Sequence, residues 1–484
     1  MIDRFRRGAV AFWRDTDGII LPYVTIMLLA IVGLSVLALD GARFMSLQTQ
    51  MQAGADALAL AGAAELDRMP DAQARATAAI NNLLSNSTVF GAGDNRNVRV
   101  ADVRFYSRLP DSDASDMAAG TPASDATNAR FVAVTVQPVA LNTILPPLVG
   151  ANVVTTGASA VAGFDQVVCG ATPIFVCNPY EVGGMTYDQA TRALQAAMAD
   201  PAVRRRLIRL RQYGRELDPY APGDYGFLDS PTIGADANVL IEALGRVRPA
   251  ACFAQSAVNL REGYMTTARE GFNVRFDLYE GAMANRTLDA DFRPAENVRK
   301  GYVGGGCHPL PADSWPIGQP PSQATGMPLD QVYPYLNGQM GNGEWDFATY
   351  WQVNHGADAR MPPNVNGAPA GNSNVPSRYA VYRYEIEQGI IADRSPGGET
   401  GAPTCYAGGN LADRPDRRIL TAAVINCQSL ALPGGAQANV PVAAFAKLFL
   451  TLPLARAQTD LYVEVIGLVR PGDDGNFDMV QLYR

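Results

Sequence analysis

Histidine is scarce in this sequence, and the usual catalytic motifs are missing from it. Only His308 and His355 occur among 484 residues. The chain has no H-E-x-x-H, no G-x-S-x-G, no P-loop and no dinucleotide-binding G-x-G-x-x-G after a strand pattern. These absences weaken the hydrolase, metalloenzyme and nucleotide-binding interpretations. We therefore expect a protein that is not an enzyme, with no catalytic, cofactor-binding or metal-binding residues and no small-molecule substrate.

Positive charge is also in deficit. The chain has 39 Lys and Arg against 47 Asp and Glu, which gives a formal net charge of −8. Nucleic-acid binding needs a concentrated basic surface, so we expect no nucleic-acid partner. One basic run, RRRLIRLR from Arg204 to Arg211, departs from this balance. It could bind phosphate or a membrane surface, or it could be the solvated face of a helix with Leu207 and Leu210 pointing inward.

Cysteine is absent from the first 168 residues and occurs six times after them. An even count favours disulfides in an oxidising compartment, with buried free thiols as the alternative. No C-x-x-C pair occurs, so a structural zinc site is not expected. Pairing between neighbours along the chain is predicted: Cys169 with Cys177, Cys405 with Cys427, and Cys252 with Cys307.

One long uncharged run stands near the N-terminus. Ile19 to Leu39 contains 21 residues without a charged side chain. As a helix it would span about 31 Å, the thickness of the hydrocarbon core of a bilayer. The anchoring side chains would include Ile19, Ile20, Leu21, Leu28, Leu29 and Leu39. Four arginines precede the run, which predicts a cytoplasmic N-terminus and places the bulk of the chain outside.

A cleaved signal peptide and a buried core helix are the alternatives to a membrane anchor. A signal peptide has an apolar region of about 7–15 residues, shorter than this run. A good cleavage site is also missing after Leu39. A core helix of a soluble protein normally keeps a polar face, which this segment lacks. The sequence therefore favours a retained anchor.

Helical patterns continue beyond the anchor and are followed by strand patterns. Gly41 to Leu66 is amphipathic, and we expect the membrane helix to continue through it as far as Pro70. A second helix is predicted for Asp71 to Ser85. Alternating β-branched residues then predict three strands, with a loop at Pro110 to Asn128 between the first two: Val98 to Tyr106, Phe131 to Val139, and Val153 to Ala162.

The remaining two thirds of the chain mix helix and strand patterns, so we expect an α+β fold with loops and antiparallel strands. The predicted helices are Tyr187 to Met198, Pro201 to Leu210 and Ala235 to Val247. The predicted strands are Tyr379 to Ile386, Ile419 to Ile425, Val442 to Leu452, Leu461 to Val469, and Asp478 to Tyr483 after a hairpin turn at Asp473 to Asn476.

A family resemblance rests on the region around the anchor. Gly18 stands directly before the apolar run, the run ends in Leu39-Asp40-Gly41-Ala42-Arg43, and Asp56 lies in ADALALAGA. Over about residues 10–66 this combination resembles the N-terminal segment of TadG-like proteins of the bacterial tight-adherence (Tad, or Flp) pilus assembly system. Gly18, Asp40, Arg43 and Asp56 are the motif residues that the resemblance picks out. Two later stretches, Gly223 to Asp229 and Glu270 to Asp277, are similar to segments of the larger TadG-like ectodomains.

Two features differ from the patterns of relatives. Pilins of this class are cut after a glycine and carry Glu five residues later, whereas Tyr23 stands in that position after Gly18. This favours a permanent anchor. Some relatives carry a D-x-S-x-S metal motif, but Asp111 to Ser115 reads DSDAS. We interpret it as a solvated linker.

The resemblance implies a domain organisation. A cytoplasmic basic N-terminus (1–18) leads to a transmembrane helix (19–39). A pilin-like helix with a small antiparallel sheet follows (40–165). The rest is an extracytoplasmic α+β domain (166–484), whose segment 301–371 is rich in Gly, Pro and aromatic residues.

The resemblance also implies a function. We expect a single-pass protein of the bacterial inner membrane, with its bulk in the periplasm. It would be a structural or assembly component of the pilus machine, in contact with other assembly proteins or pseudopilins. The alternative is a membrane-tethered glycan-binding module or glycan-active enzyme of the envelope. That protein would use the rings of 301–371 and acids such as Glu344 and Asp346 beside Trp345.

Overall fold

The chain folds into two compact units. The computed structural model describes residues 20–67, 71–82, 98–110, 116–144, 153–214, 218–230, 233–234, 236–249, 251–301, 307, 326–356, 375–391, 399–409, 411, 416–456, 458–470, 473 and 475–483. Unit 1 comprises Met1–Asp165 and Met479–Arg484, and unit 2 comprises Gln166–Asp478. Helices and mostly antiparallel strands occur in both units, so the expected α+β class is confirmed.

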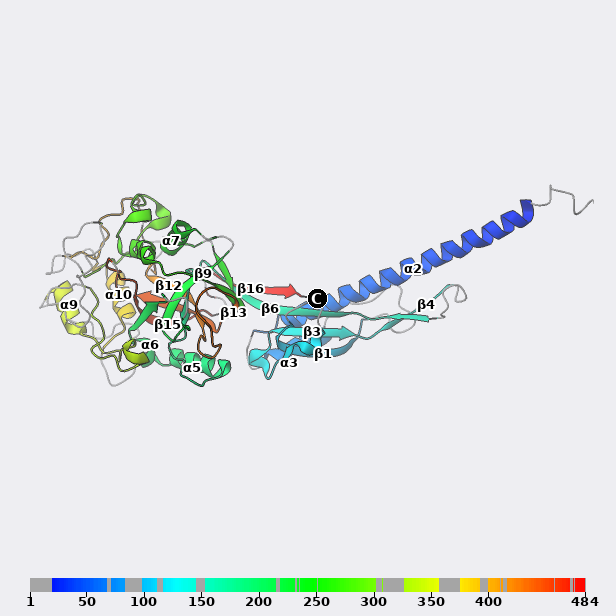
Figure 1. Ribbon diagram of the computed structural model, residues 1–484, viewed down its shortest axis with the longest axis horizontal. Helices are drawn as coiled ribbons and strands as arrows, with labels where there is room; N and C mark the ends of the chain where they lie inside the picture. Colours follow the sequence, from blue (N-terminus) through cyan, green and yellow to red (C-terminus); the bar gives the residue numbers. More distant parts are fainter. Residues whose placement is uncertain are drawn as a thin grey trace, which may run out of the picture. The chain divides into compact units, whose positions relative to one another are not determined.

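A single long helix begins the described chain. Helix α2 runs without interruption over Ile20–Ala63, 44 residues (Figure 1). Its stretch from Pro22 onward is the one helix in the described residues that is long and apolar enough to cross a membrane. Turns follow α2 as far as Asp67, before Pro70. The predicted continuation of the membrane helix into an amphipathic helix is therefore confirmed.

The second half of α2 packs closely because its inward residues are small. A Cβ atom at Gly54 would lie 2.9 Å from Cγ2 of Val98, and one at Gly62 would lie 2.6 Å from Cδ1 of Ile80. Ile80 belongs to helix α3 (Ala72–Asn82). The larger inward residues of α2 are fully buried: Leu47, Met51 and Leu58. Side chains at the two glycines would push α3 and the sheet away from the helix.

The sheet of unit 1 covers this buried face of α2. Alternate side chains Val132, Val134 and Val136 of β3 are buried against the helix, as period-2 alternation predicts. The strand order is β2-β1-β3-β6, with β16 also paired to β6, and β4 and β5 form a separate hairpin. The bounds are β1 Val100–Arg108, β2 Thr121–Pro122, β3 Phe131–Val136, β4 Val139–Asn142, β5 Val153–Thr156, β6 Ser159–Cys169 and β16 Asn476–Leu482.

Several predicted boundaries in unit 1 were wrong. The predicted strand ending at Val139 is two strands, β3 and β4, because Pro138 has no N–H to donate to a ladder. The predicted strand from Val153 to Ala162 is also two, β5 and β6, separated at Gly157. The predicted loop contains β2 and two short 3-10 helices, η1 (Met117–Ala119) and η2 (Ala126–Asn128). Asp111 to Ser115 lies outside the described residues.

Unit 2 is built on a mixed eight-stranded sheet in the order β13-β11-β9-β7-β12-β14-β15-β8. Because β8 also pairs with β9, the strands from β9 to β8 close into a barrel. Two neighbour pairs are parallel, β7 with β12 and β8 with β9. The bounds are β7 Ile174–Cys177, β8 Ile208–Gln212, β9 Asp224–Asp229, β11 Ala257–Arg261, β12 Ile419–Ile425, β13 Gln437–Pro441, β14 Ala444–Leu450 and β15 Leu461–Leu468, and the short β10 (Cys252–Ala254) pairs with β6.

Helices surround the sheet of unit 2 (Figure 1). Helix α5 begins with a capping box, in which Thr186 and Gln189 each bond the other's backbone N–H. The helices are α5 Tyr187–Ala199, α6 Pro201–Arg204, α7 Ala237–Gly245, α8 Arg269–Asn273, α9 Phe347–His355 and α10 Arg378–Glu387. The 3-10 helices are η3 Thr266–Ala268, η4 Val274–Phe276, η5 Gly281–Met283, η6 Ala290–Phe292 and η7 Leu336–Gly338.

Two predicted elements of unit 2 have the opposite structure. The predicted helix Pro201 to Leu210 ends at Arg204, and the second half of the basic run is strand β8, in which Ile208 and Leu210 alternate with outward arginines. The predicted strand Tyr379 to Ile386 is helix α10, capped by Ser377. Its inward residues Val381, Tyr382 and Glu385 are spaced at helical intervals.

The predicted C-terminal hairpin was also wrong. The last strand, β16, pairs with β6 and not with β15, so the turn at Asp473 to Asn476 does not join neighbouring strands. Asp473 instead forms an ion pair of 2.8 Å with Lys447.

All six cysteines form disulfides, but none of the predicted pairs is correct. The bonds join Cys169 with Cys252, Cys177 with Cys427, and Cys307 with Cys405. Sheet pairing explains the first two. Cys252 of β10 lies directly opposite Cys169 of β6, and Cys177 and Cys427 lie at the carboxyl ends of the parallel neighbours β7 and β12. The buried free-thiol alternative is excluded.

Candidate functional site

The first candidate region is the end of the apolar run on α2. The predicted anchor side chains Leu28, Leu29 and Leu39 are 59%, 67% and 52% exposed, which is consistent with a helix that anchors the chain in a membrane. Ile20 and Leu21 belong to the first turn of α2. Ile19 and the motif residue Gly18 lie outside the described residues.

Exposure changes abruptly at Asp40. Its side chain is only 5% exposed, directly after Leu39. Its carboxylate accepts the backbone N–H of Ile144, with oxygen–nitrogen distances of 3.0 and 3.2 Å. Arg43 donates from Nη1 to Asp40 at 3.2 Å and to the carbonyl of Asn142 at 3.4 Å. We call these four residues the boundary clamp, because they hold the β4–β5 hairpin against α2 where its apolar run ends.

The motif residue Asp56 makes a second link between α2 and the sheet. Its carboxylate accepts a hydrogen bond of 2.8 Å from Nε2 of Gln52. The same nitrogen donates to the carbonyl of Ser159 on β6 at 3.1 Å. Asp56 therefore orients the glutamine that holds the strand.

Half of the boundary clamp could not be predicted. Asn142 and Ile144 take part through backbone groups, and 104 positions separate Ile144 from Asp40. Backbone partners have no sequence signature. In the sequence, only Asp40 and Arg43 pointed to this contact. An aspartate that becomes buried at the end of an apolar helix needs a hydrogen-bond donor.

In unit 2, the stretch Glu270 to Asp277 is buried and connects distant loops. Asp277 accepts backbone N–H groups of three consecutive residues, Thr404, Cys405 and Tyr406, at 2.6–2.9 Å. Asn273 exchanges two hydrogen bonds of 2.8 Å with the backbone of Leu454. Burial raises the pKa of the Asp277 carboxyl, and the backbone donors oppose that shift. Every residue of this stretch is buried, so its side chains hold the unit together from within.

The aromatic residues proposed as a binding platform lie inside unit 2. Trp345 and Trp351 are 2% and 4% exposed and pack in one cluster with Tyr350. Of the acids considered as a glycosidase pair, Glu344 forms an ion pair of 2.7 Å with Arg205, and Asp346 caps α9. Trp315 and His308 lie outside the described residues. Among the described rings of this segment, Tyr335 is 42% exposed and lies outside that buried cluster.

A second group of polar side chains is buried around Glu385. This carboxylate accepts hydrogen bonds from Tyr350 and Asn297 and contacts Nε2 of His355 at 2.9 Å. Burial, and after it the charge of Glu385, raises the pKa of the Tyr350 hydroxyl well above its ordinary value. Glu385 has no exposed surface, so the group is a buried polar network, which Arg299 joins through an ion pair of 3.9 Å. Among the described residues, no three His, Cys, Asp or Glu side chains are placed to hold a metal ion.

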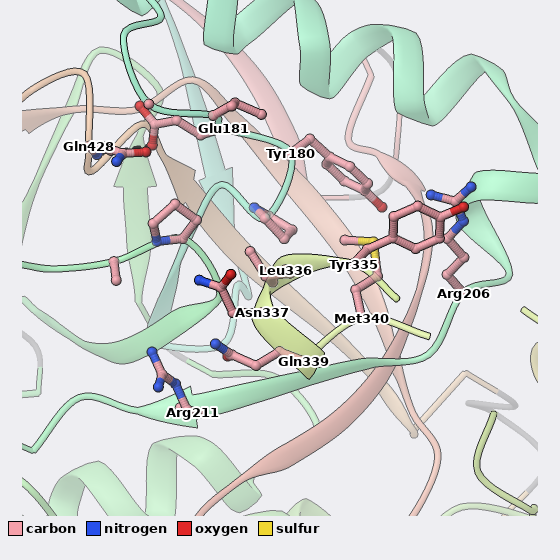
Figure 2. A pocket seen from close by; sticks show the side chains of 15 residues that line it. Tyr180, Glu181, Arg206, Arg211, Tyr335, Leu336, Asn337, Gln339, Met340 and Gln428 are labelled. Atoms are coloured by element: carbon pink, nitrogen blue, oxygen red, sulfur yellow. Dashed lines mark hydrogen bonds between the residues drawn. The ribbon is translucent and has the colours of Figure 1, made fainter. Parts of the chain in front are cut away.

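Unit 2 also contains an open cleft of about 550 Å³. It lies at the carboxyl ends of β7 and β12, an edge at which sheets of parallel strands often bind ligands. Figure 2 shows Tyr180 and Arg206 on one side of it, with the hydroxyl of Tyr180 directed toward Arg206 and Tyr335. The segment Tyr335 to Met340 also lines the cleft, with the ring of Tyr335 against Arg206. Sequence reasoning missed this cleft, and the basic run that supplies Arg206 was the one signal that pointed to it.

Comparison with known proteins identifies the N-terminal region. Residues 18–65 match a family described as putative Flp pilus-assembly TadE/G-like. The match coincides with α2 and includes the motif residues Asp40, Arg43 and Asp56. The resemblance inferred from the sequence is therefore confirmed for this segment. A comparison with curated proteins and one with solved structures gave no match for the chain.

Proposed function

We propose that this protein is a membrane-anchored component of a Tad/Flp-type pilus assembly machine that acts through protein–protein contacts in the periplasm. The observation that carries the proposal is the coincidence of the TadE/G-like match, residues 18–65, with one unbroken apolar helix. The proposed role is structural and needs no catalytic step.

Two features support the proposed orientation, with the N-terminus in the cytoplasm and both units outside the inner membrane. Arg4, Arg6, Arg7 and Arg14 precede the apolar run, and the positive-inside rule keeps such residues in the cytoplasm. The three disulfides all lie in unit 2 and need an oxidising compartment such as the periplasm.

The exposed face of α2 beyond the boundary clamp is the proposed contact surface. Met45 is 71% exposed, although it stands on the helix only two positions after Arg43. Neighbouring Leu47 is fully buried against unit 1. A helix that continues out of the membrane with one free face can pack against the helix of another assembly protein.

A photo-crosslinking amino acid at position 45, introduced into the full chain in its host, tests this contact. The expected product joins the chain to a pilin, pseudopilin or other protein of the pilus machine, identified by mass spectrometry. Leu288 in unit 2 is equally exposed, at 71%, and is the control position. If position 45 gives no product with any pilus protein while the chain remains in the membrane, the proposed contact is wrong.

A further inference from the structure

The cleft in unit 2 contains an arginine, Arg206, that forms no ion pair with the described residues. The other four arginines of the basic run are engaged: Arg204 with the carbonyl of Ile466, Arg205 with Glu344, Arg209 with Asp460 and Arg211 with Asp224. Arg206 forms no ion pair with the part of the chain that the structure describes, and its buried Nε has no hydrogen-bond partner there. Its guanidinium instead stacks on the ring of Tyr335, 4.0 Å from the centroid. Stacking leaves the in-plane N–H groups available to a planar acceptor.

Two further polar atoms at the cleft lack partners. The Tyr180 hydroxyl oxygen is buried without a hydrogen bond to the described residues. The side-chain oxygen of Gln339, a residue that is 7% exposed, also has no hydrogen bond to the described residues. Buried polar atoms are nearly always paired with protein, water or ligand, so these two atoms of the cleft that Arg206 also lines can be paired by a ligand or by water.

The wall formed by Tyr335 to Met340 is strained. Leu336 and Asn337 have φ values of 51° and 50°, a left-handed conformation that is unusual for a bulky side chain such as leucine. Leu336 remains in place because Gly223 leaves room for it: its Cδ2 lies 2.7 Å from where a Cβ of residue 223 would stand. Local strain of this kind is concentrated at binding sites.

We propose that this cleft binds the carboxyl terminus of a polypeptide whose last side chain is apolar. Arg206 and the Tyr180 hydroxyl donate to the terminal carboxylate, because a planar carboxylate matches the guanidinium edge. Gln339 accepts the N–H of a terminal peptide bond. The last side chain packs on Leu336 and Met340, which line the cleft.

The acidic residue of the cleft does not oppose an anion strongly. Glu181 is 4% exposed, and its two oxygens accept the backbone N–H groups of Gln428 and Ser429 at 3.0 and 2.6 Å. Its charge is therefore already compensated by backbone donors. Arg211 also lines the cleft, but its charge is paired with Asp224, so Arg206 is the cation of the cleft that the proposal uses.

Fluorescence anisotropy with the full chain in detergent micelles tests the proposal. The probes are fluorescein-labelled pentapeptides Gly-Ser-Gly-Ala-Xaa, in which Xaa is Leu, Phe, Met or Val. Each is prepared with a free carboxylate and with a carboxamide end. We expect saturable binding of at least one free acid, and binding of its amide that is weaker by about tenfold or more, because a charge-assisted hydrogen bond is lost.

Variants locate the site. Arg206→Gln and Tyr180→Phe should each weaken binding of the free acid, whereas Arg209→Gln, in the same basic run but outside the cleft, should not. Binding of acid and amide with equal affinity, or no saturable binding of any probe, would overturn the proposal. Competition by N-acetyl-phenylalanine at the affinity of the pentapeptide would show a small-carboxylate site and would overturn the assignment to a chain end.

Discussion

The carboxylate of Asp40 and the backbone N–H of Ile144 are hydrogen-bonded at 3.0 and 3.2 Å, although 104 positions separate them. Asp40 is the first charged residue after the apolar run of α2. The bond therefore holds the β4–β5 hairpin against α2 at the end of its apolar run, which is the proposed membrane boundary. Arg43 holds the carboxylate in place and reaches the carbonyl of Asn142.

Removing this carboxylate should release the hairpin. In Asp40→Ala, the backbone N–H of Ile144 loses its acceptor, and leaving such a donor unsatisfied costs about 1–3 kcal/mol where it is buried. We expect the amide of Ile144 to exchange with deuterium at least tenfold faster in the variant, measured on the full chain in nanodiscs. Asp56→Ala alters a different contact of α2 and is the control. Unchanged exchange at Ile144 would show that the bond does not hold the hairpin.

The hairpin should also touch lipid. Ile144 and Val153 are 45% and 48% exposed, and the residues between them include no charged side chain. β4 runs back along α2 toward Asp40, so the connection after Ile144 begins at the membrane boundary. A fluorescent label on Ile144→Cys should be quenched by spin-labelled lipids in vesicles.

Ala57→Cys is the matched control for this label. Ala57 is exposed on the same helix, 17 positions after Asp40, which corresponds to roughly 26 Å along the axis. A label there should escape quenching. Equal quenching at both positions, or none at Ile144→Cys, would contradict a boundary at Asp40.

The disulfide pattern makes a chemical prediction. A peptide map without reduction should recover Cys169 joined to Cys252, Cys177 to Cys427, and Cys307 to Cys405. The second bond spans 250 positions, and a loop of that length restricts the unfolded chain by roughly 5 kcal/mol. Reduction should therefore lower the thermal midpoint of unit 2 strongly. Peptides that join Cys169 to Cys177 would contradict the strand pairing of β6 with β10.

Glu399 should make stability depend on pH in an unusual direction. It is 5% exposed and accepts the backbone N–H groups of Lys300 and Gly301. Burial raises the pKa of its carboxyl above the ordinary value of 4.5, and these donors oppose the shift. The folded state therefore keeps the proton to higher pH than the unfolded state. The stability that this group contributes is largest below pH 4.5 and is lost as the pH rises through the folded pKa.

Thermal unfolding of Glu399→Gln checks this sign. The variant has no carboxyl to ionise, so its thermal midpoint relative to the natural chain should rise as the pH is increased from 4.5 to 7.5. Parallel curves for the two proteins would show that Glu399 does not titrate differently in the folded state. If the thermal midpoint of the variant relative to the natural chain falls as the pH rises, the pKa of Glu399 is lowered by folding and not raised.

Local signals predicted the anchor well and the rest only partly. The continuous helix α2 follows from an apolar run and the small residues after it, all within one stretch of chain. Arg204 to Arg211 misled because its helical spacing of leucines continues into a strand whose partners, β9 and β15, come from elsewhere in the sequence. Tyr379 to Ile386 misled because β-branched and aromatic residues also suit a buried helix face.

Long-range partners account for the other misses. The predicted pairing of cysteines between neighbours along the chain is wrong because sheet pairing brings together residues 83 and 250 positions apart, and two loops bring together Cys307 and Cys405, 98 positions apart. The cleft depends on the same kind of contact. Its walls come from the loop after β7, from Arg206 and from Tyr335 to Met340, and only the folded sheet brings them together.

Deletion of the encoding gene in its host, with surface pili counted by electron microscopy, tests the central claim most directly. We predict that pili are lost and that the full chain restores them, whereas a chain that begins after Leu66, without α2, does not. Normal numbers of pili in the deletion strain would contradict a role in pilus assembly. Full restoration by the chain without α2 would contradict the need for the membrane anchor.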